Sequence, residues 1–144
     1  MSVEPTISSM PQLAAAGARV SRRLEEAVAE YRVLVTSPGG GLPSPAAKAR
    51  ADYERAKAKR KLEARANGDA KSVAAAEDIA DASDEIYQAN LDRLTMEGQV
   101  DACRQEINAL RSRLSWGQSM VAAEREVDKQ HALTSPSWRD GRER

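Results

Sequence analysis

Apolar residues recur at alternating steps of three and four residues from Ile79 to Val121, which is the spacing of the buried face of a long helix. At about 1.5 Å per residue, such a helix is roughly 65 Å long. One globule of 144 residues cannot enclose it, so we expect it to pack against other helices of the chain, against copies of itself, or both. This face, called the seam below, comprises Ile79, Ala82, Ile86, Ala89, Arg93, Met96, Val100, Cys103, Ile107, Leu110, Leu114, Gly117 and Val121. Its larger apolar members, which we predict to make the core and oligomer contacts, are Ile79, Ile86, Val100, Ile107, Leu110, Leu114 and Val121.

An earlier helix is predicted over residues 11–35. Pro11 suits a first helical position, and apolar residues between Val20 and Val35 recur on one helical face. The next segment, residues 36–45, contains three glycines and three prolines. That composition is typical of a loop or hinge.

A second helix is predicted over residues 46–66, where Asn67-Gly68-Asp69 ends it. Ser72 can cap a third helix over residues 72–129. Because the connection between them is short, these two helices are expected to lie side by side and antiparallel.

The predicted fold class is therefore all-α: a long antiparallel helical hairpin, coiled-coil-like, with an additional N-terminal helix, assembling into an oligomer. A single helical domain is expected over residues 11–129. Residues 1–10 are interpreted as a flexible arm, and residues 130–144 as a disordered tail because they combine Pro136 and Gly141 with many charges.

A second apolar stripe lies off the seam, at Tyr87, Leu91, Leu94 and Gly98. It predicts a contact either with the first helix of the same chain or with a neighbouring subunit, and the sequence leaves both open. Arg93 interrupts the seam and can either fix the register of the helices or extend to their edge. Gly98 and Gly117 inside the helix are better explained by close helix packing than by a hinge.

The composition argues against an enzyme. There is no Phe, and charged residues make up 31% of the chain, a profile of long helices rather than of a thick core. The chain has one histidine, His131, and one cysteine, Cys103, on the seam, and none of the common catalytic, nucleotide-binding or metal-binding motifs. We expect no catalytic residue, no metal site and no cofactor. We also expect Cys103 to be buried and reduced, as in an intracellular protein.

Charge is segregated, although the net charge is zero. The segment from Lys48 to Arg65 has a net charge of +5, and acids without bases follow between Glu77 and Glu85. One interpretation is an ion-paired antiparallel hairpin, with Lys59 near Asp78 and Arg55 near Asp81. The other is a ridge that binds the phosphates of a nucleic acid without reading its sequence. The candidate nucleic-acid-binding residues are Arg55, Lys57, Lys59, Arg60, Lys61 and Arg65.

The basic stretch Asp52 to Asp69 and the helix that follows Ser72-Val73 resemble a known family, the UvsY-type recombination mediators of bacteriophages. Lys59, Arg60, Lys61, Leu62 and Arg65 stand where that family has a Lys/Arg-rich stretch with a Leu before a turn that contains Gly. Tyr87 and Leu110-Arg111-Ser112-Arg113 stand at its mid-helix Tyr and its Ile/Leu-x-Ser-Arg segment. The resemblance covers residues 50–125, without the family's aromatic after the basic stretch and with an added Gly/Pro loop.

The resemblance implies a ring-forming protein that binds single-stranded DNA and helps a RecA-like recombinase displace single-strand-binding protein. Two alternatives stay open: a phage structural or assembly protein, and a helical protein-interaction module. Residues 1–20 lack the apolar run of a signal peptide, and no segment resembles a transmembrane span. A cytoplasmic protein is expected, in the host cytoplasm if a phage encodes it, with no membrane partner.

Overall fold

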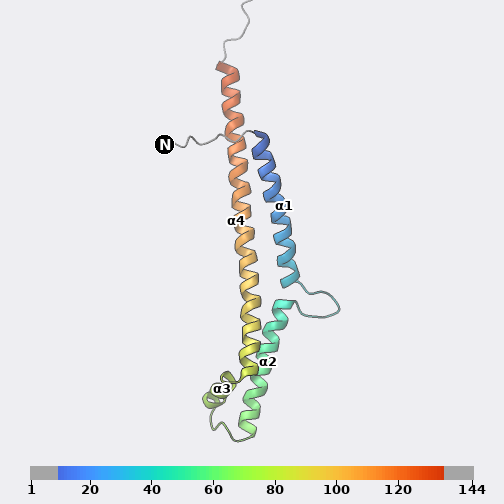
Figure 1. Cartoon of the computed structure of the whole chain (residues 1–144), viewed down its shortest axis with the longest axis vertical. Coiled ribbons are helices and arrows are strands. Elements are labelled where there is room, and N and C mark those ends of the chain that lie inside the picture. The colour runs from blue at the N-terminus through green and yellow to red at the C-terminus, as the bar shows by residue number, and fades with distance from the viewer. Residues whose placement is uncertain (1–9, 135–144) are drawn as a thin grey trace, which may run out of the picture. The chain divides into compact units, whose positions relative to one another are not determined.

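The computed structural model describes residues 10–134, which form four helices and no strand within that range (Figure 1). The prediction of an all-α fold is confirmed. The helices are α1 (Met10–Val35), α2 (Pro45–Ala66), α3 (Val73–Asp81) and α4 (Asp84–Thr134).

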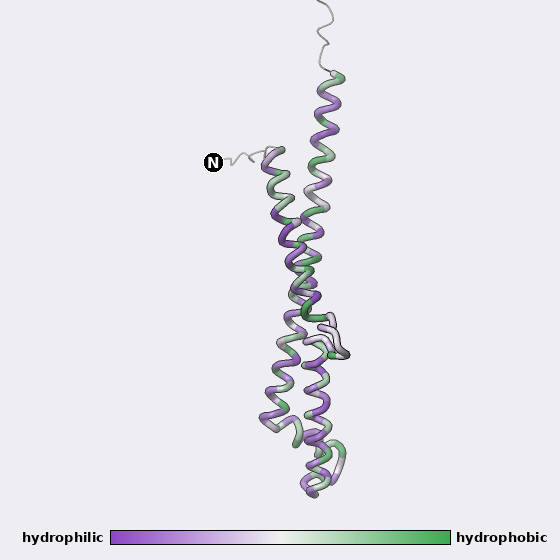
Figure 2. The backbone as a smooth tube through the Cα atoms, turned by 90° about the vertical axis from the view of Figure 1, so that its right-hand side faces the viewer, coloured by the Kyte–Doolittle hydropathy of each residue, from purple (hydrophilic) through white to green (hydrophobic). Residues whose placement is uncertain are grey.

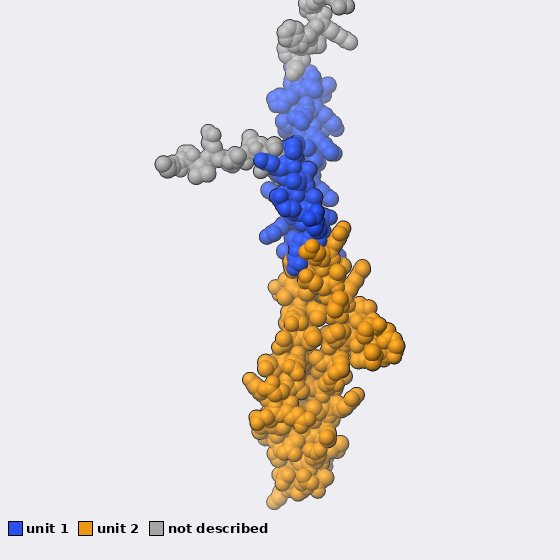
Figure 3. All heavy atoms as spheres, turned by 45° about the vertical axis from the view of Figure 1, so that its right-hand side comes forward, with its two compact units in different colours: residues 1–24, 108–144 blue, residues 25–107 orange. Residues whose placement is uncertain are grey.

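The chain divides into two compact units, coloured separately in Figure 3. One unit comprises residues 1–24 and 108–144, and the other comprises residues 25–107. The described parts of α1 and α4 contribute to both units, whereas α2 and α3 lie wholly in unit 2. The helical domain predicted over residues 11–129 thus contains two packing units.

A serine caps the start of both α2 and α3, which was predicted for Ser72 but not for Ser44. The Ser44 hydroxyl accepts a hydrogen bond from the Ala47 N–H at 3.3 Å, and the Ser72 hydroxyl accepts one from the Ala75 N–H at 3.1 Å. Each hydroxyl satisfies an N–H that has no partner within its own helix. After α2, Gly68 adopts a φ of 75°, a left-handed conformation that glycine reaches without a steric penalty.

The single helix predicted over residues 72–129 is wrong at one point. The structure has two helices there, separated by Ala82 and Ser83. The Ser83 N–H still donates to the Ala80 carbonyl at 3.1 Å, and the Ser83 carbonyl accepts from the Tyr87 N–H at 3.0 Å. One helix therefore ends and the next begins within a few residues, so Ile79 and Ala82 do not share a helix with the rest of the seam.

The outer limits of the helices also differ from the prediction. α1 already includes Met10, which was assigned to the arm, and α4 continues to Thr134, beyond the predicted end at residue 129. The remainder of the predicted arm and tail, residues 1–9 and 135–144, lies outside the described residues.

The loop between α1 and α2 is exposed at its tip. Gly39, Gly40 and Gly41 have φ values of 102°, 64° and 75°, all in the region that only glycine adopts easily. Its internal hydrogen bonds include one from the Leu42 N–H to the Gly39 carbonyl at 3.2 Å. The predicted loop is therefore present, and α1 and α2 are separate helices.

In unit 2, α2 and the first part of α4 run antiparallel and side by side, with α3 packed against α2 (Figure 1). Small side chains allow α3 to approach the end of α2 closely, where Ala64, Ala70 and Ala76 are buried together with the partly buried Ile79. The buried residues of α4 in this unit are Ile86, Val100 and Ile107.

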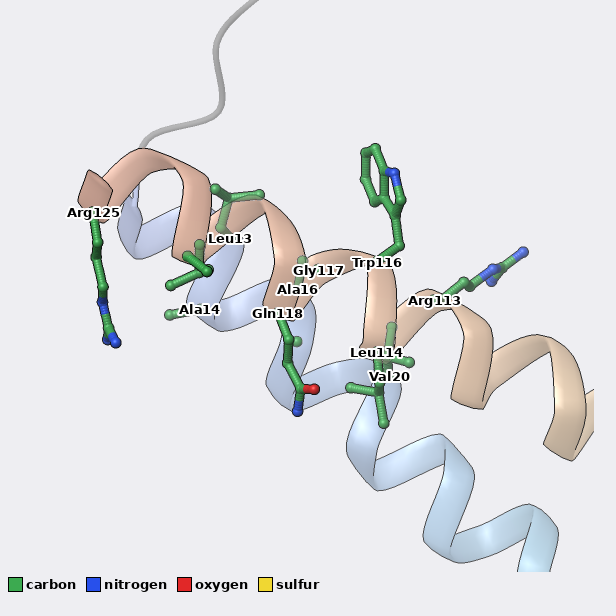
Figure 4. A pocket seen from close by; sticks show the side chains of 13 residues that line it. Leu13, Ala14, Ala16, Val20, Arg113, Leu114, Trp116, Gly117, Gln118 and Arg125 are labelled. Carbon is green, nitrogen blue, oxygen red and sulfur yellow. The ribbon is translucent and has the colours of Figure 1, made fainter. Parts of the chain in front are cut away.

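In unit 1, the N-terminal part of α1 faces the C-terminal part of α4 across an apolar groove. Val20 and Leu114 point toward one another in this groove, whereas Trp116 points away from α1 (Figure 4). Leu110 is buried, but Leu114 and Val121 are only half-buried. This part of the seam is therefore more open to solvent than the part in unit 2.

Hydrophobic and hydrophilic positions alternate along the described helices (Figure 2). Among the described residues, no helix combines the length and the apolar character that crossing a membrane requires.

Candidate nucleic-acid interface on α2

The six candidate residues do not share one face of α2. Successive residues of a helix are rotated by about 100°, so Lys57 and Lys61 lie one turn apart on a side that differs from that of Arg55 and Lys59. Lys57 and Lys61 are half-buried, and the other side is exposed. The structure therefore separates the six cations into two groups.

The first group pairs with α3. The Lys57 ammonium lies 2.9 Å from an Asp81 carboxylate oxygen and 3.2 Å from one of Glu77, and the Lys61 ammonium lies 3.4 Å from Glu77. The ion-paired hairpin interpretation thus applies to these two lysines. The expected partners were wrong, because Lys59 does not pair with Asp78 and Arg55 does not pair with Asp81 among the described contacts.

The protonation equilibria reflect this pairing. The hydrogen bond to Asp81 raises the pKa of Lys57 above its ordinary value. Burial acts in the opposite direction, and the hydrogen bond to Glu77 adds a smaller increase. In turn, the hydrogen bond from Lys57 and the nearby charge of Lys61 lower the pKa of the Glu77 carboxyl. Both changes favour the charged forms, so the α2–α3 contact is ionic at neutral pH.

The ring of Tyr53 makes cation–π contacts with two side chains. The Lys57 ammonium lies 5.9 Å from the centre of the Tyr53 ring, and the Arg93 guanidinium carbon of α4 lies 5.1 Å from it. The ring is half-buried between α2 and α4. Its face is therefore occupied by side chains of the chain itself and is not a platform for stacking a nucleic-acid base.

The second group is more open to solvent, with Arg55, Lys59 and Arg65 exposed and Arg60 half-buried. Lys59 is 74% exposed and approaches Glu63 at only 3.9 Å, near the limit of an ion pair, while Arg60 approaches Glu63 at 3.6 Å. Arg55 and Arg65 are exposed and have no ion-pair partner among residues 10–134. The Glu63 carboxylate is thus shared by two cations, and Arg55 and Arg65 are unpaired within the described residues.

Two exposed residues of α2 were not among the candidate residues. Arg50 is exposed and likewise has no ion-pair partner within the described residues. Leu62 is 68% exposed and lies one helical turn from Lys59 and two from Arg55. The spacing of four and then three residues could have placed Leu62 beside these cations, because it defines one helical face.

Within the described part of the chain, no group of three or more His, Cys, Asp and Glu residues is arranged to hold a metal ion. The exposed surface of α2 formed by Arg55, Lys59, Leu62 and Arg65, called the basic face below, is therefore the candidate site. No family model matches this chain, and neither a curated protein nor a solved structure is significantly similar to it.

Proposed function

We propose that this protein is a non-enzymatic recombination mediator that binds single-stranded DNA through the basic face of α2. The observation that supports this proposal is the exposure of Arg55 and Arg65 without ion-pair partners in the described residues, beside the 74% exposed Lys59. Unpaired cations attract phosphates because binding releases the counterions that the nucleic acid had condensed.

The chemistry of this face favours the backbone over the bases. Its polar groups are cations, which contact phosphate oxygens and carry no information about sequence. Tyr53, the aromatic residue of α2, is half-buried, and its ring is contacted by Arg93 and Lys57. Binding should therefore depend strongly on salt and only weakly on base sequence.

The link to recombination comes from the resemblance of residues 50–125 to the UvsY-type mediators. In this proposal, oligomers of the chain hold single-stranded DNA while a RecA-like recombinase replaces single-strand-binding protein. Lys57 and Lys61 have a supporting role, because their ion pairs attach α3 to α2.

The test compares two variants of the full chain by fluorescence anisotropy on a labelled oligothymidylate, titrated with salt. Replacing Arg55, Lys59 and Arg65 with Ala should weaken binding and reduce the slope of log K against log salt by about 2, since each contact with a single strand contributes about 0.7. Helix content should persist because Ala is the best helix former.

The matched variant, Lys57→Ala with Lys61→Ala, removes cations that are already paired with α3. It should lower the melting temperature and leave the slope nearly unchanged. Absence of salt-sensitive binding in the unmodified protein, or an unchanged slope in the triple variant, would refute the proposal.

A helical interaction module is the second candidate function, and one observation favours it. Tyr87, Leu91 and Leu94 on α4 are exposed apolar residues at helical spacing. An apolar helix face of this kind is typical of a protein contact. This candidate gains support if the oligonucleotide titration shows no binding.

A further inference from the structure

An apolar face of α4 in unit 2 has no partner among residues 10–134. Tyr87, Leu91 and Leu94 are 62%, 46% and 49% exposed, and they recur at steps of four and three residues. Two further steps of four residues reach Gly98 and Ala102 on the same side of the helix, which are also exposed. These five residues are called the outer face of α4 below.

The outer face differs from the seam. Ile86 and Val100, which belong to the seam, are 2% and 8% exposed. The sequence left open a contact between the outer stripe and the first helix, and the exposure of Tyr87 and Leu94 contradicts that contact. What could cover this face must therefore come from outside the described chain.

Gly98 has open space beside it in the described part of the chain. A Cβ atom built at Gly98 meets no atom within 4 Å, so the close helix packing predicted for it does not occur within the described chain. Glycine costs about 1 kcal/mol relative to alanine inside a helix. A glycine on an exposed face instead lets another helix approach the backbone closely.

The sizes of the side chains are complementary along the face. Its N-terminal end carries the large residues Tyr87 and Leu91, and its C-terminal end carries the small residues Gly98 and Ala102. A copy of the same face that runs antiparallel, centred near Leu94, places the large residues of each copy against the small residues of the other.

We propose that a second copy of this chain docks on the outer face in this antiparallel arrangement. The two copies are then related by a twofold axis, the commonest symmetry of homo-oligomers. Tyr87 packs against the partner's Ala102, and Leu91 packs against the partner's Gly98.

The charges beside the face favour the antiparallel direction. Asp84 and Asp101 lie near its two ends, and no basic residue lies between them on this side of α4, although Arg104 approaches Asp101 at 3.6 Å. A parallel copy would place each aspartate beside its equivalent, which is destabilising. In the antiparallel copy, Asp84 lies near the partner's Gln105, and Asp101 lies near the partner's Gln88, so that amide donors meet the carboxylates.

This inference concerns the oligomer of the proposed function but does not depend on DNA binding. The outer face is on α4 and the basic face is on α2. Loss of dimerisation and loss of DNA binding are therefore separately measurable.

The first test is sedimentation equilibrium on the full chain at micromolar concentration. The unmodified protein should have twice the 15.6 kDa mass of one chain, and Gly98→Leu should weaken the dimer at least tenfold. Circular dichroism should show unreduced helix content, because the added side chain has free space within the chain and Leu is a good helix former.

The matched control, Gln99→Leu, introduces the same side chain off the outer face and should leave the dimer intact. A monomeric unmodified protein, or a Gly98→Leu variant that dimerises normally, would overturn the proposal.

The second test fixes the direction by disulfide cross-linking, with Cys103→Ala as the background. Leu94→Cys lies near the axis and should cross-link to its own copy. Tyr87→Cys should not cross-link alone but should do so when mixed with Ala102→Cys. Cross-linking of Tyr87→Cys alone would indicate parallel copies and overturn the arrangement, and no cross-link in any variant would overturn docking on this face.

Discussion

The guanidinium of Arg93 on α4 lies over the ring of Tyr53 on α2, with 5.1 Å between the guanidinium carbon and the ring centre. Arg93 also donates hydrogen bonds to Glu97 at 2.9 Å and to Asn90 at 2.8 Å. Its side chain is 23% exposed. The polar interruption of the seam is therefore held in place between two helices, and this contact favours one register of α2 against α4.

A second arginine of α4 repeats the arrangement with α1. Arg104 lies about three helical turns after Arg93, with its guanidinium carbon 5.7 Å from the centre of the Tyr31 ring. It donates a long hydrogen bond of 3.4 Å to the Tyr31 hydroxyl, which raises the pKa of Arg104 and so favours its charged form. In unit 2, arginines of α4 thus contact a tyrosine of α1 and a tyrosine of α2.

The Arg93–Tyr53 contact is testable by a double-mutant cycle with Arg93→Met and Tyr53→Leu. We expect a coupling free energy of about 0.5–1 kcal/mol, the range for a partly exposed cation over an aromatic ring. Urea unfolding followed by circular dichroism measures it. If the two substitutions were simply additive, the ring contact would have no role in stability.

The ion pairs of α3 predict a loss of stability in acid. The pKa of Glu77 is lowered in the folded chain, chiefly by Lys57. Its contribution is therefore present at pH values above the ordinary pKa of a glutamate and is lost as the pH falls through the lowered value. Melting temperatures measured between pH 7 and pH 3 should fall less steeply in Glu77→Gln than in the unmodified protein. Equal slopes in both proteins would argue against this linkage.

Two glycines should respond in opposite ways to alanine. Gly117 lies inside α4, and a Cβ atom there meets nothing within 4 Å, so Gly117→Ala should stabilise the fold by about 0.5–1 kcal/mol. Gly68 has a φ of 75°, so Gly68→Ala should destabilise it. Chemical denaturation of both variants is the measurement. A destabilised Gly117→Ala would indicate that this glycine is covered in the native assembly.

Cys103 provides a probe of the seam. It was expected to be buried, but it is a free thiol of intermediate exposure. Labelling with a thiol reagent should be slower in the native protein than in urea, yet measurable, and Cys103→Ala should be well tolerated because free Cys usually acts as a small apolar residue. Labelling at the unfolded rate would mean that the seam is open at this position.

The helix signals that are local in sequence predicted most of the fold. Ser72 and the Asn67-Gly68 turn act through hydrogen bonds to residues a few positions away, so their effect is visible without tertiary structure. From Ile86 onward, every predicted seam position of α4 is buried or half-buried, because a period of three and four residues directly defines one helical face.

The break at Ala82–Ser83 was missed because the apolar spacing continues across it, from Ile79 to Ile86. A signal was available: Ser83 followed by Asp84 and Glu85 is typical of a helix start, where a hydroxyl and acidic side chains satisfy the first N–H groups. The partners of Lys57 could not be predicted, since they depend on how α3 folds back onto α2. This fold-back divides the basic segment into paired and exposed cations, which the charge count alone does not distinguish.

The exposed loop at Gly39–Gly41 means that covalent continuity between α1 and α2 contributes little to either helix. Each helix has its own terminal hydrogen bonds and its own contacts with α4 in unit 2, through Tyr31 and Tyr53. A chain cut at this loop tip would lose mainly the advantage of high local concentration. The protein is thus suited to fragment complementation, in which a separately made α1 peptide and the remainder of the chain recombine at sufficient concentration.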